Sequence, residues 1–172
     1  ASRRALTGEI TLNSTTAGVQ DSLSLTMNAD GSFIASWQSP DSDGAGIVAR
    51  RFYADGRAAS DEISVNTTTA GDQADPVVGQ DGSGRFTVTW SSDDEIVARR
   101  FDAGGTALGA EFTVNSTTTG VQDSPALAVA RDGQLVISWQ GPDADGTGIF
   151  AQRYAADGSA AGNEIAVNTF TT

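Results

Sequence analysis

The feature that most constrains this chain is one phrase, written three times and begun a fourth time. The copies read EITLNSTTAGVQDS, EISVNTTTAGDQAD, EFTVNSTTTGVQDS and EIAVNTFTT, and their first residues are spaced 53, 49 and 53 apart, at Glu9, Glu62, Glu111 and Glu164. Self-similarity at such a period is typical of repeat architectures, in which each unit buries its apolar face against the next. We therefore expect residues 1–172 to form one repeat domain, with repeats 9–61, 62–110 and 111–163 and a partial fourth repeat 164–172.

Each repeat has the pattern of four short strands. In the first copy these are residues 9–13, 22–28, 32–38 and 46–53, and in several of them apolar side chains recur at every second position. Alternation of this kind predicts half-buried strands. Asp-Gly pairs lie between the segments and supply the positive φ angles that tight turns require. The chain is therefore expected to be all-β.

Four strands linked by hairpins in about 50 residues match the length of one β-propeller blade. Because three blades cannot close a propeller, three arrangements stay open: two chains joined as three plus three blades, a closed pseudo-threefold β-trefoil or β-prism, and a piece of a longer array. One of the strands 9–13 and 164–168 is surplus to three complete repeats. An unpaired strand edge is a liability, so we expect the surplus strand to be paired.

Charge and composition exclude several classes of function. The net charge is −12, which argues against a nucleic-acid partner, since phosphates need a basic surface. The chain has no histidine and no cysteine, so it lacks the commonest general base, most zinc chemistry and all disulfides. No apolar run is long enough to span a membrane. A Cys-free, acidic chain rich in Thr, Asn and Gly suggests a secreted or cell-surface protein.

Three tryptophans, Trp37, Trp90 and Trp139, each lie 28 residues after the glutamate of their repeat. They fall on the apolar face of an alternating strand, which favours a structural role in packing one repeat against the next. The functional alternative is a platform on which sugar rings stack.

A second repeated pair joins an arginine to the glutamate 11 residues later. The pairs are Arg51 with Glu62, Arg100 with Glu111 and Arg153 with Glu164. If the intervening hairpin folds symmetrically, each pair faces across the ladder, and a bidentate Arg–carboxylate contact fixes the strand register. A ligand site is the alternative.

Two turns carry closely spaced carboxylates that end in glycine. They are PDSDGAG, with Asp41 and Asp43, and PDADGTG, with Asp143 and Asp145. Calcium prefers six to eight oxygen ligands, so these aspartates are candidate calcium ligands. The alternative is an Asp-rich turn without a metal. Calcium is the one cofactor that the sequence suggests.

The repeat as a whole resembles repeats of very large secreted bacterial proteins. The resemblance rests on E-[IF]-x-[VL]-N-[ST]-T-T-x-G-x-Q, followed by DG-x-[FL]-x-x-[ST]-W and by DG-x-G-I-x-A-x-R-[FY]. It implies an extracellular, non-enzymatic role in adhesion or surface display.

These observations favour a non-catalytic module that contacts carbohydrate or a neighbouring cell-surface protein, as a homo-oligomer or as part of a longer repeat array. No catalytic constellation stands out. The alternatives are a purely structural subunit of a surface assembly and a hydrolase that uses two of the many carboxylates.

Overall fold

The computed structural model describes residues 8–168, and within them it contains strands, turns and loops but no helix. Accordingly, no helix long and apolar enough to cross a membrane occurs in this range. The strands form three antiparallel sheets of four strands each, which confirms the prediction of an all-β, blade-like repeat.

Each sheet is a meander in which consecutive strands pair as neighbours. Sheet 1 contains β1 (Asp21–Met27), β2 (Phe33–Pro40), β3 (Ala45–Phe52) and β4 (Ile63–Ser64). Sheet 2 contains β5 (Gln73–Gln80), β6 (Phe86–Ser92), β7 (Glu95–Phe101) and β8 (Phe112–Thr113). Sheet 3 contains β9 (Asp123–Val129), β10 (Leu135–Asp143), β11 (Gly146–Tyr154) and β12 (Ile165–Ala166).

The repeated phrase closes a sheet instead of opening one. Its glutamate directly precedes β4, β8 or β12, the short fourth strand of the sheet made by the preceding residues. The last copy, at 164–168, completes sheet 3 in this way. The first copy, at 9–13, belongs to no strand of the described structure, so the prediction that the surplus strand is paired is not met there.

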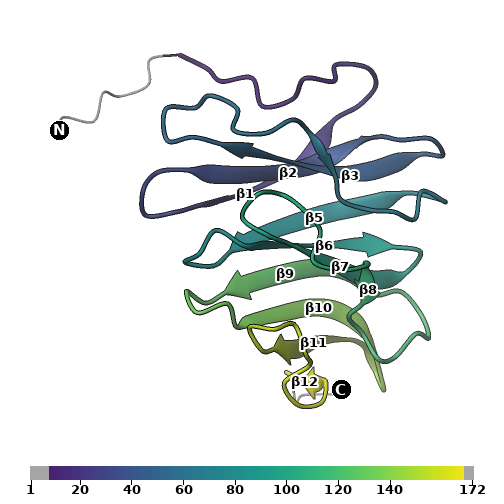
Figure 1. The fold of residues 1–172 in the computed structure, drawn as a ribbon. Coiled ribbons are helices and arrows are strands. Elements are labelled where there is room, and N and C mark those ends of the chain that lie inside the picture. Colours follow the sequence, from purple (N-terminus) through teal and green to yellow (C-terminus); the bar gives the residue numbers. More distant parts are fainter. Residues whose placement is uncertain (1–7, 169–172) are drawn as a thin grey trace.

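The sheets stack in sequence order, as Figure 1 shows from the N-terminal sheet to the C-terminal sheet. The first strand of sheet 2, β5, contacts both β1 and β9, so the first strands of all three sheets lie along one side of the stack. Two apolar clusters fill the spaces between sheets. One joins Ile47 of sheet 1 and Val65, which directly follows β4, to Trp90 of sheet 2. The other joins Ile96 of sheet 2 and Val114, which directly follows β8, to Trp139 of sheet 3.

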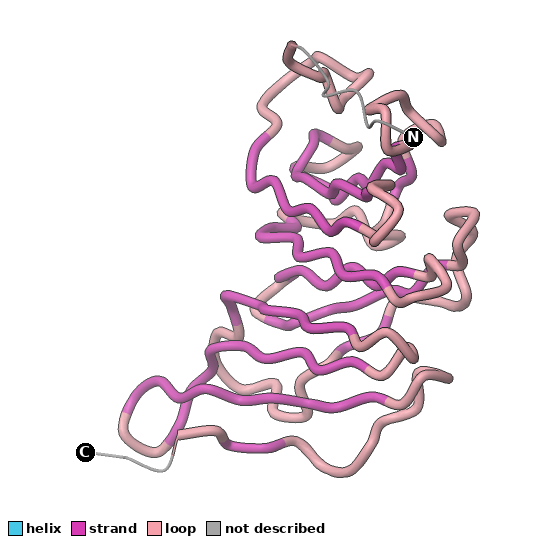
Figure 2. Tube along the Cα trace, turned by 90° about the vertical axis from the view of Figure 1, so that its left-hand side faces the viewer, coloured by secondary structure: helices cyan, strands magenta, loops and turns pink. Residues whose placement is uncertain are grey.

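Turns and loops gather at the two ends of the strands (Figure 2). One end, called the acidic end here, carries the β2–β3, β6–β7 and β10–β11 turns and the loops that enter β1, β5 and β9. Every described arginine lies toward the opposite end, in the last residues of β3, β7 and β11, in the turn after β3, or in the β5–β6 and β9–β10 turns. Within residues 8–168, the charged side chains of the acidic end are all carboxylates: Asp21, Asp41, Asp43, Asp72, Asp75, Asp93, Asp94, Glu95, Asp123, Asp143 and Asp145.

Candidate functional site

The three tryptophans lie inside the stack. Trp90 and Trp139 are almost completely buried between adjacent sheets, where they contact apolar residues of the sheet before. Trp37 is buried against Phe52 of its own sheet and is covered by Leu12. Since none of these rings has a free face, they act as packing anchors and offer no platform for a sugar.

The repeated arginines do not pair with the glutamates 11 residues later, as the sequence analysis predicted. In the β3–β4 ladder Ala49 pairs with Ile63 and Val48 with Ser64, so continuing this register sets Glu62 opposite Arg50. The register differs by one residue from the symmetric hairpin expected from the sequence. Because side chains alternate in a strand, that single step places Arg51 and Glu62 on opposite faces.

The glutamates instead bind the turn of the preceding copy of the phrase. Glu62 accepts hydrogen bonds from the backbone N–H groups of Ser14 and Thr15, the latter at 3.1 Å. Glu111 accepts equivalent bonds from the amides of residues 67 and 68 at 2.8 and 3.0 Å, and Glu164 from the amide of residue 116 at 2.7 Å. Glu111 and Glu164 therefore link one sheet to the next, whereas Glu62 links sheet 1 to the segment that precedes β1.

These bonds alter the titration of the glutamates. Partial burial opposes ionisation of Glu62, but the donors of Ser14 and Thr15 outweigh it and lower its pKa from 4.5 to about 2. The pKa of Glu111 is lowered in the same way, with burial again opposed by the donors of Thr67 and Thr68. Both groups are therefore ionised structural links at neutral pH.

The repeated arginines also reach across the stack. The Arg51 guanidinium donates to the carbonyl of Gly104 at 3.2 Å, and that of Arg100 donates to the carbonyl of Ala156 at 2.6 Å. Both acceptors lie in the β-turn of the following sheet, so these arginines are structural links as well. Arg153, the third member, ends the series on sheet 3 and has no following sheet within the described residues.

The aspartates predicted as calcium ligands stabilise their own turns. The carboxylate of Asp41 accepts from the Asp43 amide at 2.9 Å, and that of Asp143 accepts from the Asp145 amide at 3.0 Å. Within residues 8–168 no group of three or more His, Cys, Asp or Glu residues is placed to hold a metal ion. The geometry of these turns gives the calcium hypothesis no support.

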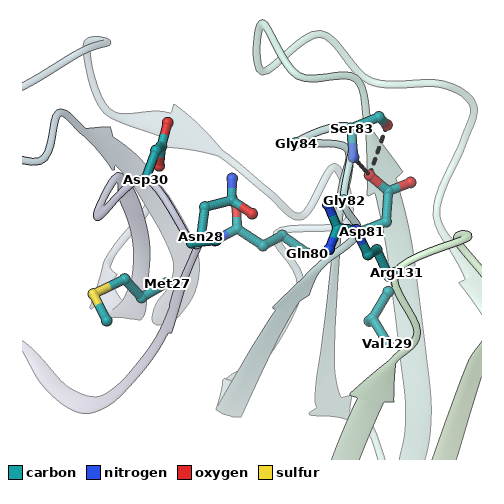
Figure 3. Close-up of a pocket in the computed structure, with 11 residues that line it drawn as sticks. Met27, Asn28, Asp30, Gln80, Asp81, Gly82, Ser83, Gly84, Val129 and Arg131 are labelled. Carbon is teal, nitrogen blue, oxygen red and sulfur yellow. Dashed lines mark hydrogen bonds between the residues drawn. The ribbon is translucent and has the colours of Figure 1, made fainter.

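A pocket lies at the opposite end, between the β1–β2 and β5–β6 turns and the end of β9 with the turn that follows it. Its volume is about 510 Å³, and Figure 3 shows polar side chains across its floor. Asn28 donates to Gln80 at 3.0 Å, while Asp81 accepts from Ser83 and forms an ion pair with Arg85 at 2.8 Å. Burial opposes ionisation of Asp81, yet the Ser83 and Arg85 donors lower its pKa. Asp81 is thus an ionised turn residue and not a proton donor.

A different arrangement occurs at the acidic end, where each first strand begins with a bulge. Ser22, Asp75 and Ser124 occupy equivalent positions and have φ angles of 50°, 52° and 53°. The ladder shifts its register at the same points. Positive φ at non-glycine residues stores strain, and such strain and bulges both concentrate at functional sites.

Each bulge carries a carboxylate at or beside the strained residue. These are Asp21 in sheet 1, Asp75 in sheet 2 and Asp123 in sheet 3. One oxygen of Asp123 is buried and has no hydrogen-bond partner in the described structure. A buried unpaired carboxylate oxygen is costly and calls for a catalytic role or a bound ligand to explain it.

The sequence analysis missed these three aspartates. A signal for them exists, because each follows the repeated glutamine within two residues, at Gln20, Gln73 and Gln122. The aspartate shifts by one position in the second copy, which breaks the alignment. In the structure Asp75 occupies the strained position that Ser22 and Ser124 hold in the other sheets, next to the positions of Asp21 and Asp123, and the bulges that relate them are visible only in the ladders.

Comparison with known proteins gives a fold but no family. No protein-family model matches the sequence. No curated protein matches it either.

Solved structures share the architecture. A protein of unknown function from Dyadobacter fermentans aligns with a TM-score of 0.62 and 14% identity over 84% of this chain and 41% of its own. An endo-arabinase from Bacteroides thetaiotaomicron aligns with a TM-score of 0.53 and 17% identity over 81% and 58%. An α-L-arabinofuranosidase from Lactobacillus brevis aligns with a TM-score of 0.54 and 14% identity over 90% and 58%.

The chain thus spans about half the length of the solved structures that it matches. At these identities the likeness establishes the fold, a stack of propeller blades. It also corrects two predictions. The non-catalytic adhesion module and the absence of enzyme activity are contradicted, since two of the three solved structures named above are an endo-arabinase and an α-L-arabinofuranosidase. The hydrolase alternative agrees better with them.

Proposed function

We propose that this chain is part of a carbohydrate-active enzyme that hydrolyses glycosidic bonds with carboxylates at the acidic end. The observation that carries the proposal is the strained bulge with an aspartate at the start of β1, β5 and β9. The glycan-degrading enzymes that share the fold support it.

Asp75 and Asp123 are the proposed catalytic pair. They stand at the starts of β5 and β9, which are in contact. Glycoside hydrolysis typically needs two carboxyl groups, one that protonates the leaving oxygen and one that acts as base or nucleophile. Asp75 is exposed, and its backbone N–H, not its carboxylate, donates to Gln38. The unpaired oxygen of Asp123 is buried, so a substrate reaches this carboxylate only through its other oxygen or after a local rearrangement.

Among the described residues no arginine or lysine lies at this end, which suits a neutral sugar polymer better than an anionic one, because the carboxylates would repel a polyanion. Arabinose-containing polysaccharides are the first substrates to test, given the endo-arabinase and the arabinofuranosidase that share the fold. A polymer of this kind is met outside the cell, which agrees with a secreted or cell-surface location.

The experiment is an assay of reducing-sugar release from a panel of neutral polysaccharides and aryl arabinosides. We expect turnover by the unmodified chain and a loss of roughly 10²–10⁴-fold in Asp75→Asn and in Asp123→Asn. The pH dependence of the rate then tells which carboxylate is the acid.

The matched control is Asp145→Asn. It removes one negative charge from the same end of the molecule but lies in the β10–β11 turn, away from the first strands. Its rate should equal that of the unmodified chain. Absence of sugar release from every substrate, or full activity in Asp75→Asn and Asp123→Asn, would contradict the proposal.

A further inference from the structure

The two outer faces of the stack carry the same kinds of apolar side chains as the two junctions between sheets, but on the outer faces these side chains are exposed to solvent. On the outer face of sheet 3, Ile149 is 43% exposed and Val167 54% exposed. The equivalent residues of sheet 2, Ile96 and Val114, are 0% and 6% exposed because sheet 3 covers them. The outer face of sheet 3 thus has the side chains of a junction but no neighbour.

The outer face of sheet 1 is the other half of such a junction. On β1, Leu23, Leu25 and Met27 are largely exposed. The residue of sheet 2 equivalent to Leu25 is Val78, which is 5% exposed and packs against sheet 1. The exposed side of β1 therefore has the apolar side chains that, in sheet 2, pack against a neighbouring sheet.

A repeated arginine also supports the pairing of the outer faces of sheets 3 and 1. Arg51 and Arg100 each donate to a backbone carbonyl in the turn after the third strand of the following sheet. Arg153 occupies the equivalent position on the outer face of sheet 3 and is exposed. The carbonyls it would meet on a neighbouring sheet of this type are those of the Ala54–Asp55 turn.

From these observations we propose that two copies of this chain associate head to tail, with sheet 3 of each packed on sheet 1 of the other, into a closed ring of six sheets. The occupant is a second copy because its sheet 1 presents the face that sheets 2 and 3 already present at the internal junctions. Propellers close with about four to eight blades, so a sum of six is within the range. Burying both apolar faces removes two exposed patches from each chain.

In this ring, residues 9–13 must leave the position that they occupy on sheet 1. They are a copy of residues 164–168, and Leu12 covers Trp37 as Val65 covers Trp90 at the first internal junction. β12 is held in the ladder of sheet 3, whereas residues 9–13 belong to no ladder. The β12 segment of the second copy therefore takes the position, and residues 9–13 compete with it.

The test measures mass in solution by light scattering after size exclusion, for the chain and for two variants. Val167→Asp places a charge on the face of sheet 3, and Leu25→Asp places one on the face of sheet 1. The unmodified chain should have twice the single-chain mass of 17.6 kDa. Each variant alone should be monomeric, because every junction of its ring would contain one damaged face.

Mixing the two variants sharpens the test. One junction of the mixed pair joins two undamaged faces, so a heterodimer should form, and its formation shows that both variants are folded. Leu108→Asp is the matched control, since Leu108 is equally exposed but lies in the turn before β8. It should leave the dimer intact.

Removing residues 1–13 should tighten the pair by removing the competing segment, which is seen as a lower dissociation constant. The proposal is overturned by a monomeric unmodified chain at high micromolar concentration. A Leu25→Asp variant that still dimerises would equally overturn it, because two sheet 3 faces would then be in contact. An open series of larger assemblies would contradict closure of the ring.

Discussion

Sheet 2 and sheet 3 carry closely similar residues in different surroundings. Val114 is buried and Val167 is exposed, although both are the fourth residue of the repeated phrase and directly follow the last strand of a sheet. The difference arises from the presence of a following sheet and not from the strand itself. In a stack of repeats, the free energy gained from a side chain therefore depends on its neighbours as much as on its own repeat.

The largest effect is expected at the centre of the stack. Trp90→Ala should lower the free energy of unfolding by about 3–5 kcal/mol, because Trp90 fills the cluster between sheets 1 and 2. Trp37→Ala should cost less, since only the Leu12 segment covers that side of sheet 1. Urea denaturation measures both, and equal losses would contradict a difference between internal and outer sheets.

A matched pair of isoleucines tests the comparison directly. Ile96→Ala should cost about 2–5 kcal/mol of unfolding free energy, whereas the equivalent Ile149→Ala should cost under about 1 kcal/mol in dilute, monomeric protein. Because the same atoms are removed in both variants, the difference between the two losses of unfolding free energy measures the contribution of the covering sheet. If the further inference holds, the cost of Ile149→Ala increases with protein concentration, and a concentration-independent cost would count against the paired ring.

The glutamate links provide an intermediate effect. Glu111→Gln should cost about 1–3 kcal/mol, because the backbone amides of Thr67 and Thr68 lose a charged acceptor. Glu9→Gln is the control, since the described residues contain no preceding turn for Glu9 to bind. Thermal unfolding distinguishes the two, and equal shifts in Tm would refute the link.

The smallest effect is a dependence on pH. The folded-state pKa of Glu62 is about 2 and its ordinary value is 4.5, so the folded protein binds fewer protons than the unfolded chain between them. The stabilisation is fully present above pH 4.5 and is lost as the pH falls toward 2. Glu62→Gln should flatten the acid side of the curve of urea midpoint against pH. An unchanged slope in that variant would show that other carboxyl groups cause the loss.

Much of the fold could be predicted from the sequence, because alternation and Asp-Gly turns are local properties. The strand pattern, the length of a blade and the three repeats all follow from them. The start of the repeat is not a local property. The phrase that begins with Glu62 looks like the opening of a unit, but its strand closes sheet 1, since pairing partners are chosen in three dimensions.

The site was harder to predict for two physical reasons. A one-residue difference in the β3–β4 register separated Arg51 from Glu62, and register depends on the packing of whole sheets. The bulges at the starts of β5 and β9 are also a product of pairing, so the placement of Asp75 and Asp123 at these bulges is hidden in the linear order. The main prediction of function was wrong because the aspartates lie one residue after Gln20 and Gln122 but two after Gln73, so their spacing is not constant and they were not recognised as a set.

By itself, the sequence determined that this chain is all-β and built from three similar four-stranded units, because the period of two along each strand and the turn residues act over a few neighbouring positions. Only the tertiary structure decided which strand closes each sheet, that the repeated glutamate binds the preceding turn, and that Asp21, Asp75 and Asp123 begin adjacent first strands. Those facts depend on contacts between residues about 50 positions apart, which local pattern does not encode.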